Sequence, residues 1–321
     1  MHADGRRFGN RFLASCAVAA SLWAAEPPKT IVIENVFVVD VAKGVVRPRG
    51  HVKIAAAESR VVDARGGFLI PGMWDMHVEG RTETRLAAMV AEGIAGVRDF
   101  GTPWKRIREW QGRGGLPAVV GSGEALEAHT AIEARAAFDR AWKLDVNFVS
   151  VRRDLPGEAY IALAEQARHW RVRLAGPVPS SIAARDAAEA RQWSIEGTAA
   201  LDAAALERCA LMGTRLTPLL ASASVEDRAE AVRVVAAARR AGVEILAGSG
   251  VASIQSELEQ LVAAGMSARE ALAAATVAPR KLLGVEDSDV VLLRGNPLQD
   301  VRNTRRVAGV VLRGRYRSVG N

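Results

Sequence analysis

The stretch Leu69-Ile70-Pro71-Gly72-Met73-Trp74-Asp75-Met76-His77-Val78-Glu79 decides how this chain is interpreted. Apolar residues lead to His77 and Glu79 at the end of a predicted strand. Side chains at i and i+2 of a strand point to the same side, so these two side chains should project together. Histidines at both places would form a His-x-His pair that binds a metal. With glutamate at the second place the pair can begin a metal site, but two ligands cannot complete one.

The composition is that of a large folded protein. The chain has 321 residues, 49% of them hydrophobic, which is enough to bury a sizeable core. The formal net charge is +7, but aromatic residues are only 5% of the chain, and no run of basic residues is interleaved with aromatic ones. We therefore expect no nucleic-acid partner.

The N-terminus has the layout of a secretory signal peptide. Arg6, Arg7 and Arg11 precede an apolar run from Phe12 to Ala24, and Glu26-Pro27-Pro28 follows. The run is too short for an ordinary membrane span. We therefore predict a signal peptide over residues 1–25 and an exported protein, periplasmic or secreted, without a membrane span after cleavage.

Cleavage of that segment would remove one of the two cysteines, Cys16, and leave Cys209 alone. A mature chain with one cysteine has no internal disulfide, so we expect its stability to come from core packing.

From about residue 68 onward the pattern alternates between strands and helices. The predicted strands are Phe68–Val78, Ala95–Phe100, Ala118–Gly121, Asn147–Val151, Arg173–Val178, Ser194–Glu196, Arg215–Leu220 and Glu244–Gly248. The predicted helices include Thr82–Glu92, Ala131–Leu144, Gly157–Trp170, Ile182–Trp193, Ala203–Met212 and Val225–Ala241. Eight strand–helix units predict an α/β fold of the (β/α)₈ type, a TIM barrel, because parallel strands need helical crossovers.

The two ends of the chain read as additional β structure. Thr30–Asp40 is predicted to pair with the segment from Val45 to Ile54, and Asp289–Leu293 and Val307–Leu312 read as further strands. We expect these end segments to form a small, incomplete β-sandwich beside the barrel. The predicted division is 26–66 for the N-terminal part of the sandwich, 67–286 for the barrel and 287–321 for the C-terminal part.

A series of short motifs, in order over most of the chain, resembles the metal-dependent amidohydrolase superfamily, in particular its imidazolonepropionase-like and Xaa-Pro dipeptidase-like branch. The motifs are Val62-Asp63-Ala64-Arg65-Gly66-Gly67 running into Pro71-Gly72, Gly96-Val97-Arg98-Asp99, Ala175-Gly176-Pro177-Val178-Pro179, Ser194-Ile195-Glu196, Leu246-Ala247-Gly248-Ser249, Ala271-Leu272 through Ala275-Thr276, Gly295-Asn296-Pro297-Leu298-Gln299-Asp300 and Val311-Leu312-Arg313-Gly314. The resemblance implies a TIM barrel with one or two divalent metals, such as zinc, at its mouth, and hydrolysis of C–N bonds in cyclic amides or Xaa-Pro dipeptides.

The resemblance also implies where the metal ligands should be, and five of six positions are altered. His77 matches the first histidine and Glu79 replaces the second, which leaves both as a vestige of the metal site. The other four positions carry Ser150 in place of a lysine, Pro177 and Gly197 in place of histidines, and Gly250 in place of an aspartate. Proline and glycine have no side-chain donor, and a catalytic zinc usually needs three protein ligands. We therefore expect no bound metal cofactor.

Few residues could rebuild the site. Among the other histidines, His51 falls in the predicted sandwich and His169 ends a helix, so both are interpreted as surface or core-edge residues. His129 is the remaining candidate, because its loop follows the third barrel strand. Lys143 lies on a helix and cannot replace the lost lysine.

The leading hypothesis is an amidohydrolase-like pseudoenzyme whose mouth binds a small molecule through His129, Asp99, Arg152 and Arg153. Two alternatives remain open. One is a working hydrolase with an unorthodox mononuclear centre at His77 and Glu79, helped by Asp99 or His129. The other is a non-catalytic subunit that pairs with an intact amidohydrolase or with a second copy of itself.

Overall fold

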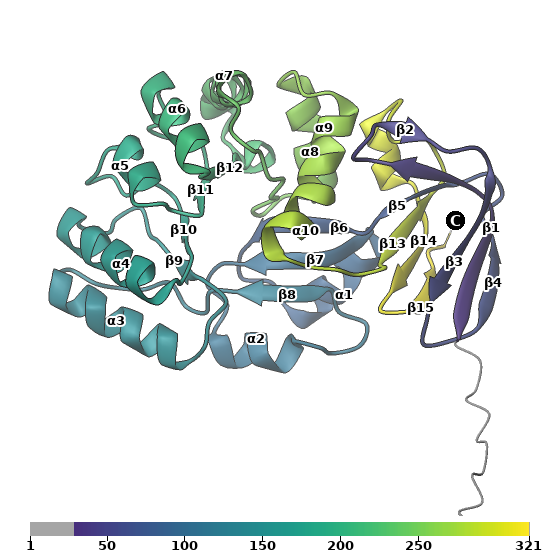
Figure 1. The fold of residues 1–321 in the computed structure, drawn as a ribbon, viewed down its shortest axis with the longest axis horizontal. Coiled ribbons are helices and arrows are strands. Elements are labelled where there is room, and N and C mark those ends of the chain that lie inside the picture. Colours follow the sequence, from purple (N-terminus) through teal and green to yellow (C-terminus); the bar gives the residue numbers. More distant parts are fainter. Residues whose placement is uncertain (1–28, 321) are drawn as a thin grey trace, which may run out of the picture.

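The computed structural model describes residues 29–320 (Figure 1). The predicted signal peptide, residues 1–25, lies outside this range. Within it, no helix is both long and apolar enough to cross a membrane.

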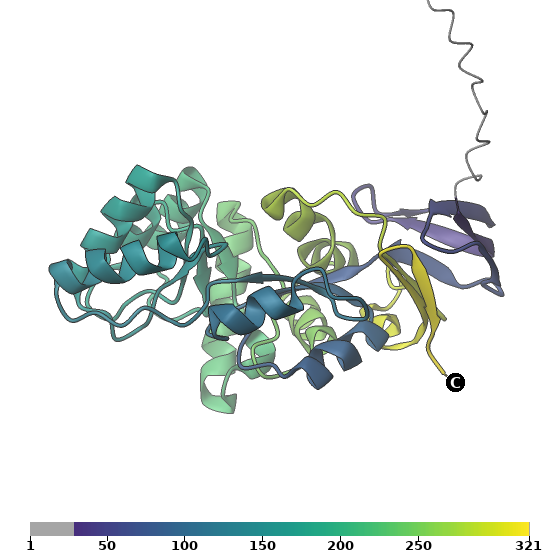
Figure 2. The ribbon, with the colours of Figure 1, turned by 90° about the horizontal axis from the view of Figure 1, so that it is seen from below.

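The N-terminal strands and the C-terminal strands lie together at one end of the molecule (Figures 1 and 2). They form an eight-stranded β unit with the order β15-β14-β13-β5-β1-β2, to which β3 and β4 are added along β1. The strands are β1 Thr30–Asp40, β2 Val45–Val46, β3 Gly50–Ala55, β4 Arg60–Asp63, β5 Phe68–Pro71, β13 Val290–Leu293, β14 Val307–Leu312 and β15 Arg315–Ser318.

The long strand β1 belongs to both layers of this unit. Its first half pairs with β3 and β4, and its second half pairs with β5 and β2. The register shifts between Ile33 and Val36, where Asn35 adopts a left-handed backbone with φ of 55°. Such a bulge bends a strand and increases its twist. Ile31, Leu69 and Val311 fill the core between the layers, so the predicted sandwich is present and joins both ends of the chain.

The segment Phe68–Val78, predicted as one strand, is in fact two. β5 belongs to the sandwich, where it pairs with β13, and β6 (Met73–Val78) is the first barrel strand. The break falls at Gly72, whose amide donates to the carbonyl of Asp289. A Cβ atom at this position would lie 2.5 Å from Cβ of Ala95. The close approach requires glycine and lets the backbone change sheets.

The predicted barrel is confirmed. Parallel pairing joins β6, β7 and β8 in one sheet and β9 to β12 in a second. The remaining barrel strands are β7 Ile94–Asp99, β8 Ala118–Gly121, β9 Val149–Ser150, β10 Leu174–Gly176, β11 Ser194–Glu196 and β12 Arg215–Thr217. The two sheets meet at Asn147, whose amide donates to the carbonyl of Gly121.

The eighth barrel segment is held by isolated bridges. Ile245 bridges to Leu216 on β12, and Gly250 bridges to Val78 on β6. The amide of Met76 also donates to the carbonyl of Ala247. The segment 244–250 therefore lies between β12 and β6 and brings the last strand beside the first.

Helices surround the barrel strands (Figures 1 and 2). They are α1 Glu83–Ala91, α2 Trp104–Trp110, α3 Ala131–Lys143, α4 Gly157–Trp170, α5 Ala184–Glu189, α6 Ala203–Met212, α7 Val225–Ala241, α8 Ile254–Ala263, α9 Ala268–Ala275 and α10 Val277–Leu283. The helix predicted over Ile182–Trp193 is shorter than expected, because the chain turns at Arg191, whose φ is 59°.

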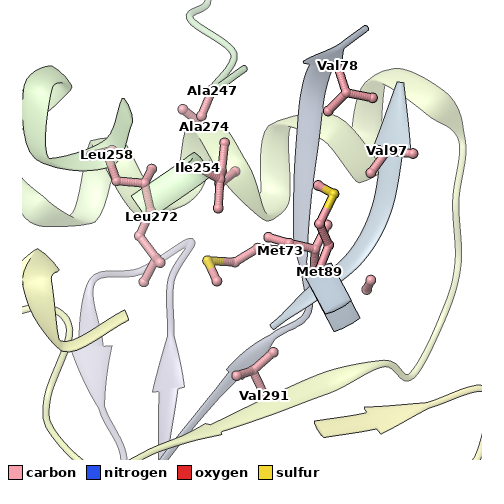
Figure 3. Packing of buried hydrophobic residues seen from close by; sticks show 14 of the residues in the cluster. Met73, Val78, Met89, Val97, Ala247, Ile254, Leu258, Leu272, Ala274 and Val291 are labelled. Atoms are coloured by element: carbon pink, nitrogen blue, oxygen red, sulfur yellow. The ribbon is translucent and has the colours of Figure 1, made fainter. Parts of the chain in front are cut away.

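The largest apolar core lies between β6, β7 and the helices α1, α8 and α9 (Figure 3). Met73, Val97 and Leu272 belong to this cluster, and Val291 of β13 joins it from the sandwich side. One continuous apolar core therefore packs against the first barrel strand and fixes the position of its polar end.

Candidate binding site at the barrel mouth

His77 lies near the end of β6, inside the mouth of the barrel. Its side chain is buried, and its ring stacks on Phe100, with centroids 4.2 Å apart and an interplanar angle of 20°. Phe100 in turn contacts Phe148 edge to face. The imidazole is therefore fixed by packing before any polar contact is considered.

Both ring nitrogens of His77 face a carboxylate. Nε2 lies 3.0 Å from Oε1 of Glu79, and Nδ1 lies 3.0 Å from Oε2 of Glu196 on β11. Glu79 is 59% exposed, whereas Glu196 is almost fully buried. The arrangement is a closed Glu–His–Glu chain across the mouth.

Opposite charges stabilise the Glu79–His77–Glu196 arrangement. Burial alone would lower the pKa of His77, but hydrogen bonds and charge from Glu196 and Glu79 outweigh it and raise the pKa to about 9. Burial alone would raise the pKa of Glu196, but Arg98 and His77 hold it below its usual value. At neutral pH the imidazolium donates to both carboxylates.

Arg98 is the second cation of the mouth, and it lies entirely inside the barrel. Its Nη2 donates to Oε1 of Glu196 over 2.6 Å, its Nη1 to Oγ of Ser194 over 2.8 Å and its Nε to the carbonyl of Met76 over 2.7 Å. The guanidinium also lies 5.2 Å from the ring centroid of Trp193. A buried arginine needs this many partners because leaving a charge unpaired in the interior is costly.

Asp75 ties the first strand to the last. Its Oδ1 accepts from the amide of Ser249 over 2.8 Å, and its Oδ2 accepts from the hydroxyl of Ser249 over 2.5 Å. Burial raises the pKa of Asp75, although these hydrogen bonds oppose the shift. Arg81 donates to the carbonyl of Gly250 over 2.6 Å. The end of the eighth barrel segment is therefore held by side chains from the β6 side.

Three of the four positions where the resemblance implies further ligands carry proline or glycine and offer no side-chain donor. Pro177 follows β10, and Gly197 follows β11 with φ of 84°. Gly250 has φ of 57°, and a Cβ atom there would lie 2.7 Å from Oγ of Ser222. Backbone in the left-handed region disfavours most side chains. Position 250 therefore lacks the carboxylate, and its backbone conformation would also disfavour an aspartate there.

The donors present do not fit a catalytic metal. In residues 29–320 no group of three or more His, Cys, Asp or Glu side chains could hold a metal ion. His77 has both nitrogens committed to glutamates, and Glu196 is shared with Arg98. A zinc site needs three or four converging donors.

The residues proposed from the sequence for ligand binding fall into two groups. Asp99 is buried and accepts from the amide and hydroxyl of Thr102, both over 3.0 Å. His129 is exposed, and its backbone amide donates to Glu133. Neither residue lines the mouth cavity, whereas Arg152 and Arg153 do.

The mouth cavity has a volume of about 600 Å³ and opens beside His77 and Glu79. It is also lined by Phe100, Gly101, Ala125, Ser150, Val151, Arg152, Arg153, Asp154, Pro177 and Ser180. The hydroxyl of Ser150 is buried and has no hydrogen-bond partner among the described residues. A buried hydroxyl without a partner at a cavity wall is suited to a hydrogen bond with a ligand.

The two arginines differ in their availability. Arg152 makes a bidentate pair with Asp154, with both contacts at 2.9 Å. Arg153 makes no ion pair within residues 29–320, and it also lines an adjoining cavity that includes Gly197. Arg153 is therefore the mouth cation that a ligand could reach without breaking an existing pair.

The histidines assigned to the surface or the core edge lie away from the mouth. His51 is exposed on β3 of the sandwich. His169 is in the last turn of α4, where its ring meets Trp170 edge to face.

Solved structures with closely similar architecture are known. A Xaa-Pro dipeptidase with bound methionine in its active site superposes with a TM-score of 0.77 over 90% of this chain and 100% of its own, at 18% identity. The chain has the amidohydrolase fold. Bottromycin amidohydrolase matches with a TM-score of 0.75 at 18% identity, over 92% of this chain and 88% of its own. The ochratoxinase of A. niger matches with a TM-score of 0.76 at 16% identity, over 91% and 96%. Neither a protein-family model nor a curated protein matches the sequence.

Sequence reasoning placed Arg98 near the mouth as a possible partner of its carboxylates, but it did not assign Glu196 to the site or predict that the two residues pair. Both residues lie within motifs that resemble the amidohydrolases, yet their pairing joins strands that are far apart in the chain. One local signal was present: Ser194 and Glu196 are two residues apart on a short predicted strand, so both should face the barrel interior.

Proposed function

We propose that this protein of amidohydrolase fold binds a small carboxylate-bearing molecule at its barrel mouth and does not perform metal-assisted C–N hydrolysis. The observation that carries the proposal is the donor set of the mouth: its one histidine is held between Glu79 and Glu196, while Pro177, Gly197 and Gly250 contribute no side-chain donor. Both imidazole nitrogens and Glu196 are already engaged, so the mouth lacks the three free protein ligands that a catalytic zinc usually needs.

The class of ligand follows from the groups that remain available. Arg153 can pair with a carboxylate, and the hydroxyl of Ser150 can accept or donate one hydrogen bond. Phe100 and Pro177 supply apolar wall. The exposed carboxylate of Glu79 suits an ammonium group. A free amino acid or a short peptide combines these features, and methionine occupies the active site of a Xaa-Pro dipeptidase with the same fold.

Two measurements test the two parts of the proposal. Elemental analysis of the purified full chain should find far less than one zinc, manganese or iron per chain. Calorimetric titration with methionine and with a Xaa-Pro dipeptide should show binding that Arg153→Ala weakens about tenfold or more, the size expected for losing a charged hydrogen bond. Arg240→Ala, which changes an exposed arginine on α7, is the matched control.

Each outcome bears on one part of the proposal. A tightly held divalent metal at one or more per chain would overturn the non-catalytic part. Absence of binding, or equal binding by Arg153→Ala, would overturn the ligand class. Hydrolysis of the dipeptide that both a chelator and His77→Ala abolish would instead support a mononuclear hydrolase built on His77 and Glu79.

A further inference from the structure

Two tryptophans are exposed where most are buried. The chain has seven tryptophans, and six lie within residues 29–320. Four of the six are 8% exposed or less. The other two, Trp142 and Trp170, are each 46% exposed and touch each other, with ring centroids 4.7 Å apart. Leu144, next to Trp142, is 55% exposed.

These rings come from the last turns of two neighbouring helices, α3 and α4. The same turns carry four exposed cations, which with Trp142, Leu144 and Trp170 we name the α3–α4 patch: Arg140, Lys143, Arg168 and Arg171. None of the four cations makes an ion pair within the described part of the chain. Elsewhere on the same two helices, Arg135 and Glu165 do form an ion pair, at 2.9 Å.

Helix geometry explains part of this composition. Cations are favoured at helix C-termini by the helix dipole, so some basic residues are expected in these turns. The dipole does not explain two half-exposed indoles between them. The exposed acids of the same turns, Asp139 and Asp145, leave the patch with a positive balance. The chain as a whole is also positive, at +7.

The patch lies away from both the sandwich and the binding site. α3 and α4 are at the end of the molecule opposite the sandwich (Figures 1 and 2). Trp170 is followed within four residues by the first residue of β10, so the patch is at the N-terminal face of the barrel. The mouth is at the C-terminal face. A partner on the patch would leave the mouth open.

We propose that the α3–α4 patch docks on a membrane surface that contains anionic phospholipids. Charge complementarity favours this occupant over a second copy, because two positive patches would repel each other. Indole rings suit the boundary between headgroups and acyl chains, and long arginine and lysine side chains can reach the phosphates around them. A nucleic acid is less well matched, because each ring already contacts the other and offers less free face for stacking.

The test is binding of the full chain to phosphatidylcholine vesicles with and without phosphatidylglycerol, measured by co-sedimentation. The variant Trp142→Ser/Trp170→Ser removes the indoles, and Arg140→Gln/Arg168→Gln removes two charges. Leu211→Ser, which changes a 73% exposed residue on α6, is the matched control. Circular dichroism and thermal melting verify that each variant is folded. The apolar run at 12–24 is common to all variants, so only differences between them count.

We expect binding that requires phosphatidylglycerol and that falls about fivefold for each lost cation, with the control unchanged. The emission of the wild-type chain should shift to shorter wavelength on binding, and that shift should be lost in the tryptophan variant. Equal binding to neutral vesicles, or equal binding by wild type and both patch variants, would overturn the proposal. So would patch-dependent binding to an acidic polypeptide or a DNA duplex without binding to vesicles.

Discussion

Nδ1 of His77 lies 3.0 Å from Oε2 of Glu196, and this contact joins the end of β6 to the end of β11 across the barrel mouth. The histidine lies at a position where the resemblance implies a metal ligand, yet here its ring links two carboxylates. A contact of this kind stabilises the fold, because it satisfies a carboxylate that is buried on every side.

His77→Ala should therefore reduce stability. We expect a loss of about 2–3 kcal/mol in the free energy of unfolding, because two charge-assisted hydrogen bonds disappear while Arg98 still neutralises Glu196. Urea denaturation measures the loss. His129→Ala, at an exposed histidine, should change stability by no more than about 0.5 kcal/mol. Equal stabilities of wild type and His77→Ala would show that the Glu–His–Glu chain does not support the mouth.

The sequence was sufficient for the barrel because each strand–helix unit is local. Turn residues and helical periodicity mark the ends of segments such as Gly157–Trp170, whose predicted and observed bounds agree. The break at Gly72 could not be predicted, since it depends on Ala95 and Asp289, which approach from other elements. Proline followed by glycine at 71–72, within a predicted strand, was the local sign of it.

The site was harder to predict for the same physical reason. His77 and Glu196 are 119 residues apart, so no spacing rule connects them. Sequence position did place Arg152 and Arg153 at the mouth, because residues that follow a barrel strand lie at its open end. It could not show that Asp99 turns toward Thr102, since that depends on the local turn.

Arg98 and Glu196 should be strongly coupled. Arg98→Met should cost about 3–5 kcal/mol, because it leaves a carboxylate in the barrel interior with only His77 as its counter-ion. A double-mutant cycle with Glu196→Gln should give a coupling energy of more than about 1.5 kcal/mol. Arg98→Lys should not restore stability, because one ammonium cannot reproduce the bonds to Ser194 and the Met76 carbonyl. Additive single-variant costs would contradict this picture.

Removal of metal should leave the protein unchanged. The melting temperature should be the same with chelator and with added zinc, because the donors of the mouth do not form a zinc site. A ligand that binds only the folded state would instead raise the melting temperature, and the rise would grow with the logarithm of its concentration. Restoring one carboxylate by Gly250→Asp should lower stability by about 1–2 kcal/mol, because the backbone there has φ of 57° and Cβ would crowd Ser222. Gly197→Asp is the comparison variant, because no atom lies within 4 Å of a Cβ atom added at Gly197. A zinc-dependent rise in the melting temperature of the wild type would contradict the prediction.

Glu257 on α8 should make the protein less stable as the pH rises. Its carboxyl is completely buried; Oε2 accepts from the amide of Ala221 over 2.7 Å, and Oε1 has no partner among the described residues. Burial raises the pKa of Glu257 from 4.5 to about 8. Between these values the folded chain holds a proton that the unfolded chain has released. The contribution of Glu257 to stability is therefore complete below pH 4.5 and is lost as the pH rises through 8. The full loss is on the order of 3–5 kcal/mol.

Glu257→Gln isolates this effect, because the amide has the shape of the protonated acid and does not ionise. At pH 5 the variant and wild type should unfold at similar urea concentrations, and at pH 8 the variant should be the more stable of the two. The raised pKa of His77 also makes stability fall as the pH rises from 6.5 to 9. This effect is common to both proteins, so it cancels in their difference. Glu207→Gln, at an exposed position on α6, should follow the wild-type curve. Parallel curves for wild type and Glu257→Gln from pH 5 to 8 would show that the buried carboxyl does not take up a proton on folding.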